Sequence, residues 1–427
     1  WDLNTIFNEI HVHFQNSLQN GIILQQTQLD DFNAILQLQK DSKEYRPTLY
    51  DFIAHNALVF YKTNETSTTK PANKFELSKQ DFERSYELKN DIYNFQKDSL
   101  SLQLNALKIY QDLISFHHNT KNENAFVSVE LERLKFIEQH AYFKEKETVY
   151  LENLTALKAA YKKHEVSTLV DFEIATIYNQ KGNLYNAESS NEHQFQKAKA
   201  LEICDVAIEK FPKSLGSQKC NSLKASILQP TLSITTEKHV AINLPNKFLV
   251  KYKNLNKLFT SIYKVSDAEI RTFHKIYNQA AKVEFIHKLS LNNAFNNTLK
   301  NEKDYQQHAT EIVMPSLKNG SFLIVSAPSK KITKESIYAT SIIQSTNISV
   351  VQKSTNDQNI FQVINRNTGK PLPNSKITIK NYNTGRYNKS ISRKLSTNKL
   401  GEFSFKTSSY HRNVIISVET ETEKASF

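Results

Sequence analysis

NIFQVINRNTGKPLPNSKITI, residues 359–379, contains two short segments in which apolar and polar side chains alternate. Such alternation is typical of a β-strand with one buried face. Between the segments, Gly369 supplies the positive φ that a tight reversal needs, and Pro371 and Pro373 lack the amide proton that a central strand would donate. We therefore predict two strands joined at a corner, with no residue in the corner that could carry out chemistry.

The segment TNKLGEFSF, residues 397–405, continues the pattern downstream. Gly401 is expected at a second reversal, because glycine tolerates positive φ. The alternate apolar side chains of the whole region would then point into one β-sandwich core, which we expect to consist of Phe361, Val363, Ile377, Ile379, Phe403, Phe405, Val414, Ile416 and Val418.

The chain up to about residue 228 has the apolar spacing of helices instead. In residues 101–116, 129–141 and 150–161, large apolar side chains recur every three to four positions, which predicts amphipathic helices. Pro47, at the head of RPTLYDFIAHNALVFY, is expected in the first turn of another helix. Short connections between many such helices indicate an array of α-helical hairpins over residues 1–228.

One hairpin, in residues 172–212, has the spacing of a tetratricopeptide repeat. Small residues at fixed intervals would let two helices approach closely, and a proline would end the second helix. The residues concerned are Ala175, Tyr178 and Gly182, followed by Ala200, Cys204, Ala207 and Pro212. We predict a tetratricopeptide-like region around 165–228, with an unusually long loop; the same spacing also occurs in ordinary helical hairpins.

Beyond Pro230 the apolar period changes to two, and short strands follow at close intervals. A helical stretch interrupts them at about 266–284. We therefore expect a multidomain protein, α then β, with two macroglobulin- or immunoglobulin-like antiparallel β-sandwiches, at 229–330 and 331–427. The chain begins with Trp1 and ends abruptly, so we expect a fragment of something larger, with the second sandwich truncated.

The chain has 427 residues and a net charge of +12, which is unevenly distributed. From residue 328 onward there are 12 Lys and 4 Arg against 5 Glu and 1 Asp, a net charge of +10. This excess fits either a solvated β surface or a docking face for an acidic partner, for lipid headgroups or for polysaccharide. Nucleic acid is not expected as a partner, because no basic run is interleaved with aromatic residues.

No arrangement of residues indicates an enzyme, a cofactor site or a metal site. His11 and His13 lie two apart on a helix and so point away from each other. His117 and His118 end a helix, where a positive charge suits the helix dipole. Nucleophile elbows, P-loops, zinc-protease motifs and dinucleotide fingerprints do not occur in the sequence.

The stretch V-x-N-R-x-T-G-K-P-L-P-x-S-x-I-x-I, followed by T-x-x-x-G-x-F-x-F, resembles the macroglobulin β-sandwich of bacterial alpha-2-macroglobulins. Asn365 stands where Asp is usual, and Ser375 where Ala is usual. Residues 46–61, 129–141 and 211–227 resemble the helical region that precedes such sandwiches in the large alpha-2-macroglobulin-like proteins of Bacteroidetes. The resemblance covers most of the chain.

Alpha-2-macroglobulins trap proteases, and some carry an internal thioester formed by a Cys and a Gln three positions later. Neither Cys204 nor Cys220 has a Gln at that spacing, so this chain cannot form the thioester. The two cysteines lie on either side of Pro212 on helices expected to be antiparallel. They are therefore either partners in a disulfide, as an oxidising periplasm would allow, or two small buried residues.

The resemblance implies a non-catalytic scaffold portion of a protease-trapping protein in the envelope of a Gram-negative bacterium, at the periplasm or outer membrane. The expected partners are proteins, with membrane association only through a lipid anchor outside this chain, and the chain itself is expected to be monomeric. The alternative is a tetratricopeptide and β-sandwich adaptor subunit of an outer-membrane secretion or uptake complex. A glycan-binding sandwich would need exposed Trp platforms, which the sequence lacks.

Overall fold

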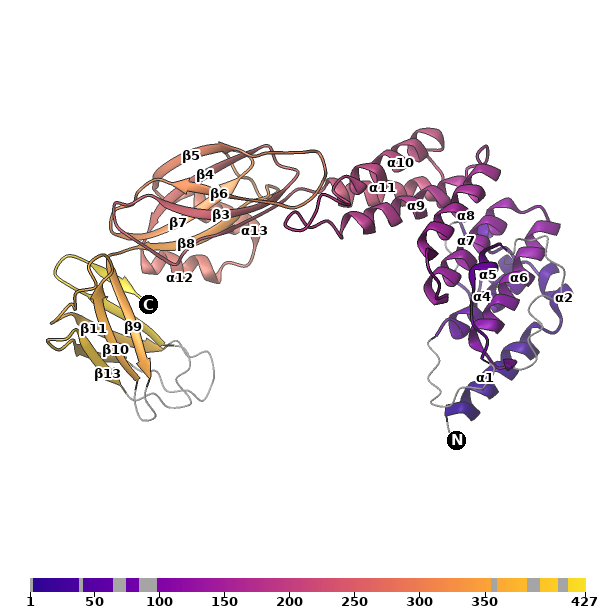
Figure 1. Ribbon diagram of the computed structural model, residues 1–427, viewed down its shortest axis with the longest axis horizontal. Coiled ribbons are helices and arrows are strands. Elements are labelled where there is room, and N and C mark those ends of the chain that lie inside the picture. The colour runs from indigo at the N-terminus through magenta and orange to yellow at the C-terminus, as the bar shows by residue number, and fades with distance from the viewer. Residues whose placement is uncertain are drawn as a thin grey trace. The chain divides into compact units, whose positions relative to one another are not determined.

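The computed structural model describes residues 3–37, 41–63, 74–83, 98–354, 359–381, 392–405 and 414–427 (Figure 1). The chain divides into two compact units, Trp1–Ile227 and Leu228–Phe427. The described elements of the first unit are helices, and those of the second are mainly antiparallel strands. The expected order of helices followed by β-sheets is therefore confirmed.

The helices of the first unit share one hydrophobic core. The apolar stripe predicted in residues 101–116 lies within it, since Leu104, Leu107, Tyr110 and Leu113 are all completely buried. The described helices are α1 (Leu3–Leu18), α2 (Gly21–Gln26), α3 (Ser42–Tyr45), α4 (Leu49–Tyr61), α5 (Lys79–Glu83), α6 (Leu102–Asn119), α7 (Glu123–His140), α8 (Lys146–Ala160), α9 (Ser167–Gly182), α10 (Gln196–Lys210) and α11 (Leu215–Leu228), with a 3-10 helix at Leu29–Phe32.

Helices α9, α10 and α11 approach closely at small residues. A Cβ added to Gly182 would lie 2.6 Å from Lys197 Cγ, and one added to Gly216 would lie 2.2 Å from the backbone carbonyl carbon of Thr168. Ala200 is fully buried between the helices. These contacts explain why small residues recur in this region; its assignment as a tetratricopeptide repeat stays a prediction.

Two sheets of the second unit enclose a core made of Phe248, Val250, Leu258, Ile262 and Ile324, among other residues. Neighbouring strands in both sheets pair antiparallel except β2 and β8, which pair parallel. The three-stranded sheet has the order β1 (Thr231–Thr235), β3 (Asn246–Lys253), β6 (His308–Met314). The five-stranded sheet has the order β2 (His239–Val240), β8 (Ala339–Ser345), β7 (Gly320–Ala327), β4 (Lys257–Val265), β5 (Leu291–Thr298).

Helices α12 (Asp267–Lys275) and α13 (Gln279–His287) cover the outer face of the five-stranded sheet (Figure 1). Strand β7 is consequently buried on both faces. Phe322 and Ile324 face the core between the sheets, while Leu323 and Val325 contact the helices. This double burial explains the uninterrupted apolar run FLIV in the sequence.

Two further sheets enclose a separate core, and it contains the nine residues predicted for it. Eight of them are buried, and Val414 is partly buried against the others. One sheet has the order β13 (Glu402–Phe405), β10 (Asn359–Asn365), β9 (Ile348–Ser354). The other has the order β12 (Ser392–Ser396), β11 (Lys376–Asn381), β14 (Val414–Glu419), β15 (Lys424–Ser426).

The stretch 359–379 is the corner that it was predicted to be. Strands β10 and β11 belong to facing sheets, so the segment between them crosses from one sheet to the other. Gly369 has φ 69° and Gly401 has φ 73°, as predicted for both reversals. Gly401 also lies against the corner, where its carbonyl accepts a hydrogen bond from Val363 N at 2.8 Å.

The expectation of purely antiparallel sheets was wrong for one pair, because β2 runs parallel to β8. Three strands were also not anticipated: β2, β5 and β12. Strand β5 reads LNNAFNNT and is only partly buried on one face, so its apolar side chains are too few to produce an alternating pattern. Strand β2 has two residues, and tertiary contacts rather than local pattern stabilise such a short strand.

Candidate functional site

The two cysteines predicted as a disulfide or as buried small residues lie on α10 and α11. Both side chains are fully buried, and both thiols are free. They are hydrogen-bonded to each other, and this contact lowers the pKa of Cys204 while it raises the pKa of Cys220. The structure therefore brings the two sulfur atoms together, as the antiparallel hairpin suggested, and the disulfide stays a prediction.

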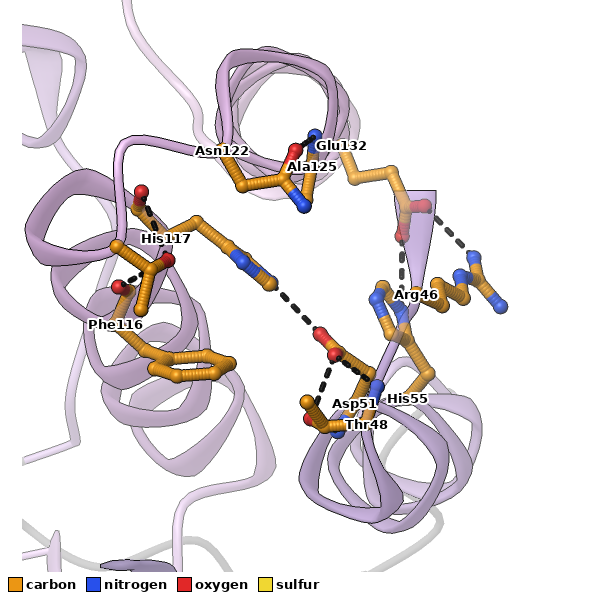
Figure 2. Close-up of polar contacts among 10 residues, drawn as sticks. Arg46, Thr48, Asp51, His55, Phe116, His117, Asn122, Ala125 and Glu132 are labelled. Atoms are coloured by element: carbon orange, nitrogen blue, oxygen red, sulfur yellow. Dashed lines mark hydrogen bonds and ion pairs between the residues drawn. The ribbon is translucent and has the colours of Figure 1, made fainter. Parts of the chain in front are cut away.

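A fully enclosed polar contact in the first unit joins α4 to α6 (Figure 2). His117 Nε2 lies 2.7 Å from Asp51 Oδ1, and both side chains are completely buried. Asp51 is in the first turn of α4 and His117 in the last turn of α6. Because the two residues are 66 positions apart in sequence, the contact fixes one helix against the other.

The second carboxylate oxygen of Asp51 accepts hydrogen bonds from Thr48 N at 3.0 Å and from Thr48 Oγ1 at 2.8 Å. Thr48 Oγ1 accepts in turn from Asp51 N at 3.3 Å. This reciprocal arrangement is a capping box, which satisfies backbone donors at the start of α4. Pro47 precedes the cap rather than occupying the first turn, so the predicted place of Pro47 in the helix was wrong.

A second group of polar residues lies beside this pair, on the same helix α4 and on α7 (Figure 2). Glu132 accepts a hydrogen bond from Arg46 Nη2 at 3.0 Å, and its other oxygen lies 3.7 Å from His55 Nδ1. Burial lowers the pKa of His55 to about 4, although Glu132 acts in the opposite direction. His55 is therefore neutral at physiological pH.

Three polar atoms in this region are buried without a hydrogen-bond partner among the described residues: His55 Nε2, Tyr110 Oη and His117 Nδ1. Thr48, Asp51 and His117 contain the residue types of a catalytic triad, but Asp51 lies between the other two. The hydroxyl of Thr48 therefore faces the carboxylate and not the imidazole, so the three side chains do not form the relay of a Ser-His-Asp triad. Since all three side chains are sealed in the core, their contacts serve to hold α4 against α6.

Sequence reasoning placed His117 at a helix end and missed its partner. His117 and His118 look alike in sequence, yet His117 is 1% exposed and His118 is exposed. The Thr48–Asp51 spacing does carry the local signal of a capping box. Nothing local connects that signal to His117, because the contact depends on how α4 and α6 pack. Among the described residues, no group of three or more His, Cys, Asp or Glu is arranged to hold a metal ion.

Comparison with known proteins gives no match to a family model or to a curated protein. Among solved structures, the chain is similar to a fragment of alpha-2-macroglobulin from Escherichia coli spanning domains MG0-NIE-MG1. That similarity has 9% identity and a TM-score of 0.34 and covers 47% of this chain and 64% of the fragment. The chain therefore matches less than two thirds of that fragment's length.

A shorter fragment of the same protein, spanning NIE-MG1, is similar at 10% identity and a TM-score of 0.33, over 47% of this chain and 97% of the fragment. The CARDB domain of the PF1109 protein from Pyrococcus furiosus is similar at 11% identity and a TM-score of 0.16, over 28% of this chain and 88% of the domain. Similarity at these values does not place the chain in either family.

Proposed function

We propose that this chain is a non-catalytic scaffold portion of a Bacteroidetes-type alpha-2-macroglobulin-like protein, which acts in the bacterial cell envelope to trap or inhibit proteases. The observation that supports this proposal best is the corner at residues 365–375. Its sequence resembles the motif of macroglobulin sandwiches, and it connects the two facing sheets of one sandwich. No helix of the described chain is long and apolar enough to cross a bilayer, and any membrane attachment is proposed to lie outside the chain.

The two departures from the motif are compatible with this corner. Asn365 Oδ1 accepts hydrogen bonds from the backbone N of Asn367 and of Thr368, both at 3.0 Å. An aspartate carboxylate at this position would accept the same bonds, so the substitution preserves the turn. Ser375 is buried and donates to Leu372 O at 3.0 Å, so its hydroxyl is satisfied where an alanine would need no partner.

Deletion of residues 1–427 from the parent protein, meaning the longer protein of which this chain is proposed to be a portion, tests the scaffold role. We expect the truncated parent to lose its ability to protect proteins from a protease, because the scaffold would no longer hold its downstream domains. The intact parent, assayed with the same protease, is the control. Full protection by the truncated parent would contradict the scaffold role.

The charge distribution favours one second candidate, an adaptor subunit of an outer-membrane secretion or uptake complex. The net charge of +10 in the last hundred residues suits docking to an acidic protein surface. Purification of the intact parent from envelope extracts separates the two candidates. A stoichiometric membrane complex would favour the adaptor, and recovery of cleaved protease with the parent would favour the trap.

A further inference from the structure

A groove of about 1010 Å³ lies within the β unit, between its two pairs of sheets. One wall consists of the outward-facing residues of β11, β14 and β15, including Lys380, Ser417 and Lys424. The other consists of residues near β1 and on β8 and α12, including Ile342 and Arg271. The volume is at the upper end of the range of about 300–1,000 Å³ for ligand sites.

The groove is strongly cationic. Its lining has carboxylates at Asp267 and Glu419, and its Lys and Arg side chains are Lys238, Arg271, Lys282, Lys376, Lys380 and Lys424. Lys376 lies 3.9 Å from Glu419. Within the part of the chain that the structure describes, no carboxylate lies within ion-pair distance of Lys238, Arg271, Lys380 or Lys424. Lys380 and Lys424 belong to one wall of the groove, and Lys238 and Arg271 line the other. All four side chains are exposed and so are available to an anionic ligand.

Contacts at one end of the groove hold its walls together. Glu423 Oε2 accepts from Thr346 Oγ1 at 2.9 Å and from Asn347 N at 2.8 Å. The Gln344 side chain accepts from Ser426 N at 2.9 Å. The rings of His239 and Phe427 stack at a centroid distance of 4.6 Å. These bonds connect the two pairs of sheets directly, so the groove is preformed and binding would require little ordering.

We propose that this groove binds an acidic polypeptide segment of a partner protein. Its cations would pair with Glu or Asp side chains, while Ile234, Ile342 and Ile415 supply apolar surface for the residues between them. A cationic wall alone would suit any polyanion, but the apolar residues between the cations suit a chain that alternates acidic and apolar side chains. A nucleic acid would instead favour exposed aromatic rings for base stacking, and Phe427 is already stacked on His239.

The inference does not rest on the scaffold role, which needs no ligand in this groove, and it assigns to one groove the acidic docking suggested for the adaptor candidate. The test uses the full 427-residue chain and a fluorescein-labelled peptide of alternating Glu and Leu, with a Gln and Leu peptide as the neutral probe. The groove variant combines Arg271→Gln, Lys380→Gln and Lys424→Gln. The matched control combines Lys318→Gln, Lys353→Gln and Lys399→Gln, which removes the same charge from exposed positions outside the groove lining.

We expect fluorescence anisotropy to show binding of the Glu and Leu peptide that weakens with added salt. The groove variant should bind the peptide about tenfold or more weakly than the natural 427-residue chain, and the control variant should stay within about twofold of the natural chain. The neutral peptide should bind much more weakly than the acidic one. An equal loss in both variants would overturn the proposal, because the attraction would then be a property of the whole basic surface.

Duplex DNA and phosphatidylglycerol vesicles serve as competing probes. Groove-dependent binding of either probe, without binding of the acidic peptide, would overturn the assignment to a polypeptide. Failure of the natural chain to bind the acidic peptide would also overturn the proposal. If the groove variant does not fold, hydrogen–deuterium exchange of the natural chain provides the test. Bound peptide should protect β11 and β14 from exchange. Unchanged exchange in these strands would contradict the proposal.

Discussion

At the scale of single residues, the Asp51–His117 pair is a buried polar contact. Such a contact adds little net stability, but removing one of its two partners costs much stability. Both side chains lie in the core, where charges are costly unless they are paired. Each helix presents one partner, so the pair specifies how α4 lies against α6. Removing one partner would leave the other buried and unsatisfied.

The first prediction concerns this pair. His117→Ala should lower the free energy of unfolding of the helical unit by about 3–5 kcal/mol, because Asp51 would keep a buried carboxylate without its partner. Urea unfolding followed by far-UV circular dichroism measures the change. His118→Ala is the matched control, since His118 is the exposed neighbour on the same helix. Similar losses in the two variants would contradict the clamping role of the pair.

His55 provides a prediction on pH. The pKa of His55 is about 4 in the folded protein and 6.5 ordinarily. Above pH 6.5 the side chain is neutral in both the folded and the unfolded chain, so it does not lower the free energy of unfolding there. Between these values the unfolded chain binds a proton that the folded chain does not. The free energy of unfolding should therefore fall by about 3 kcal/mol as the pH drops from 6.5 to about 4.

Other groups titrate in the same range, so the measurement compares two proteins. Stability is recorded against pH for the natural chain and for His55→Gln. The variant should show a shallower acid loss, because Gln does not bind the proton. Parallel curves for the two proteins would show that His55 does not account for the pH dependence.

At the scale of elements, the close packing of α11 on α9 depends on a residue without a side chain. Gly216 lies against the backbone of Thr168 and Leu169, which cannot move aside as a flexible side chain could. Gly182 meets mainly the side chain of Lys197. Two glycines that look equivalent in sequence therefore differ in what replacing them would disturb.

Gly216→Ala is predicted to destabilise the helical unit by about 2–3 kcal/mol, because the added methyl group would force α9 and α11 apart. Thermal unfolding by circular dichroism measures this. Gly21→Ala is the control: its added Cβ would lie 3.9 Å from Tyr50, an ordinary contact. We expect Gly21→Ala to be as stable as the natural chain. If Gly216→Ala also left the stability unchanged, that result would argue against close packing at Gly216.

The α10–α11 hairpin carries the prediction on the two cysteines. Incubation with oxidised glutathione should form a Cys204–Cys220 disulfide, with both thiol protons and two electrons passing to the glutathione disulfide. The mass should fall by two hydrogens, and the free energy of unfolding should rise by about 3 kcal/mol, as for a closed loop of about 15 residues. Complete alkylation of both thiols after this treatment would support the alternative of two small buried residues.

At the scale of the whole molecule, the two units have separate cores. The helical core draws its members from residues up to Leu215, and the three β cores draw theirs from Leu232 onward. Each unit therefore buries its own apolar surface, which is the main stabilising contribution to folding. Nine residues of the last core were predicted from alternation alone, because strands of that sandwich have one apolar and one polar face.

Residues 1–227 and 228–427, produced separately, should each fold and unfold cooperatively. The first fragment should have a helical circular dichroism spectrum and the second a β spectrum, and their sum should reproduce that of the intact chain. Each fragment should keep the melting temperature of the corresponding transition in the whole chain. A fragment that lacks a cooperative transition would show that its core depends on the other unit.

The sequence by itself determined the change from helices to strands, the corner at residues 359–379 and the apolar residues of the last core. Those features depend on periodicity and on glycine and proline conformations, which act over a few neighbouring residues. Only the tertiary structure decided that His117 meets Asp51, that β2 runs parallel to β8, and that six cations line one groove. Such contacts join residues far apart in the chain, and packing alone brings them together.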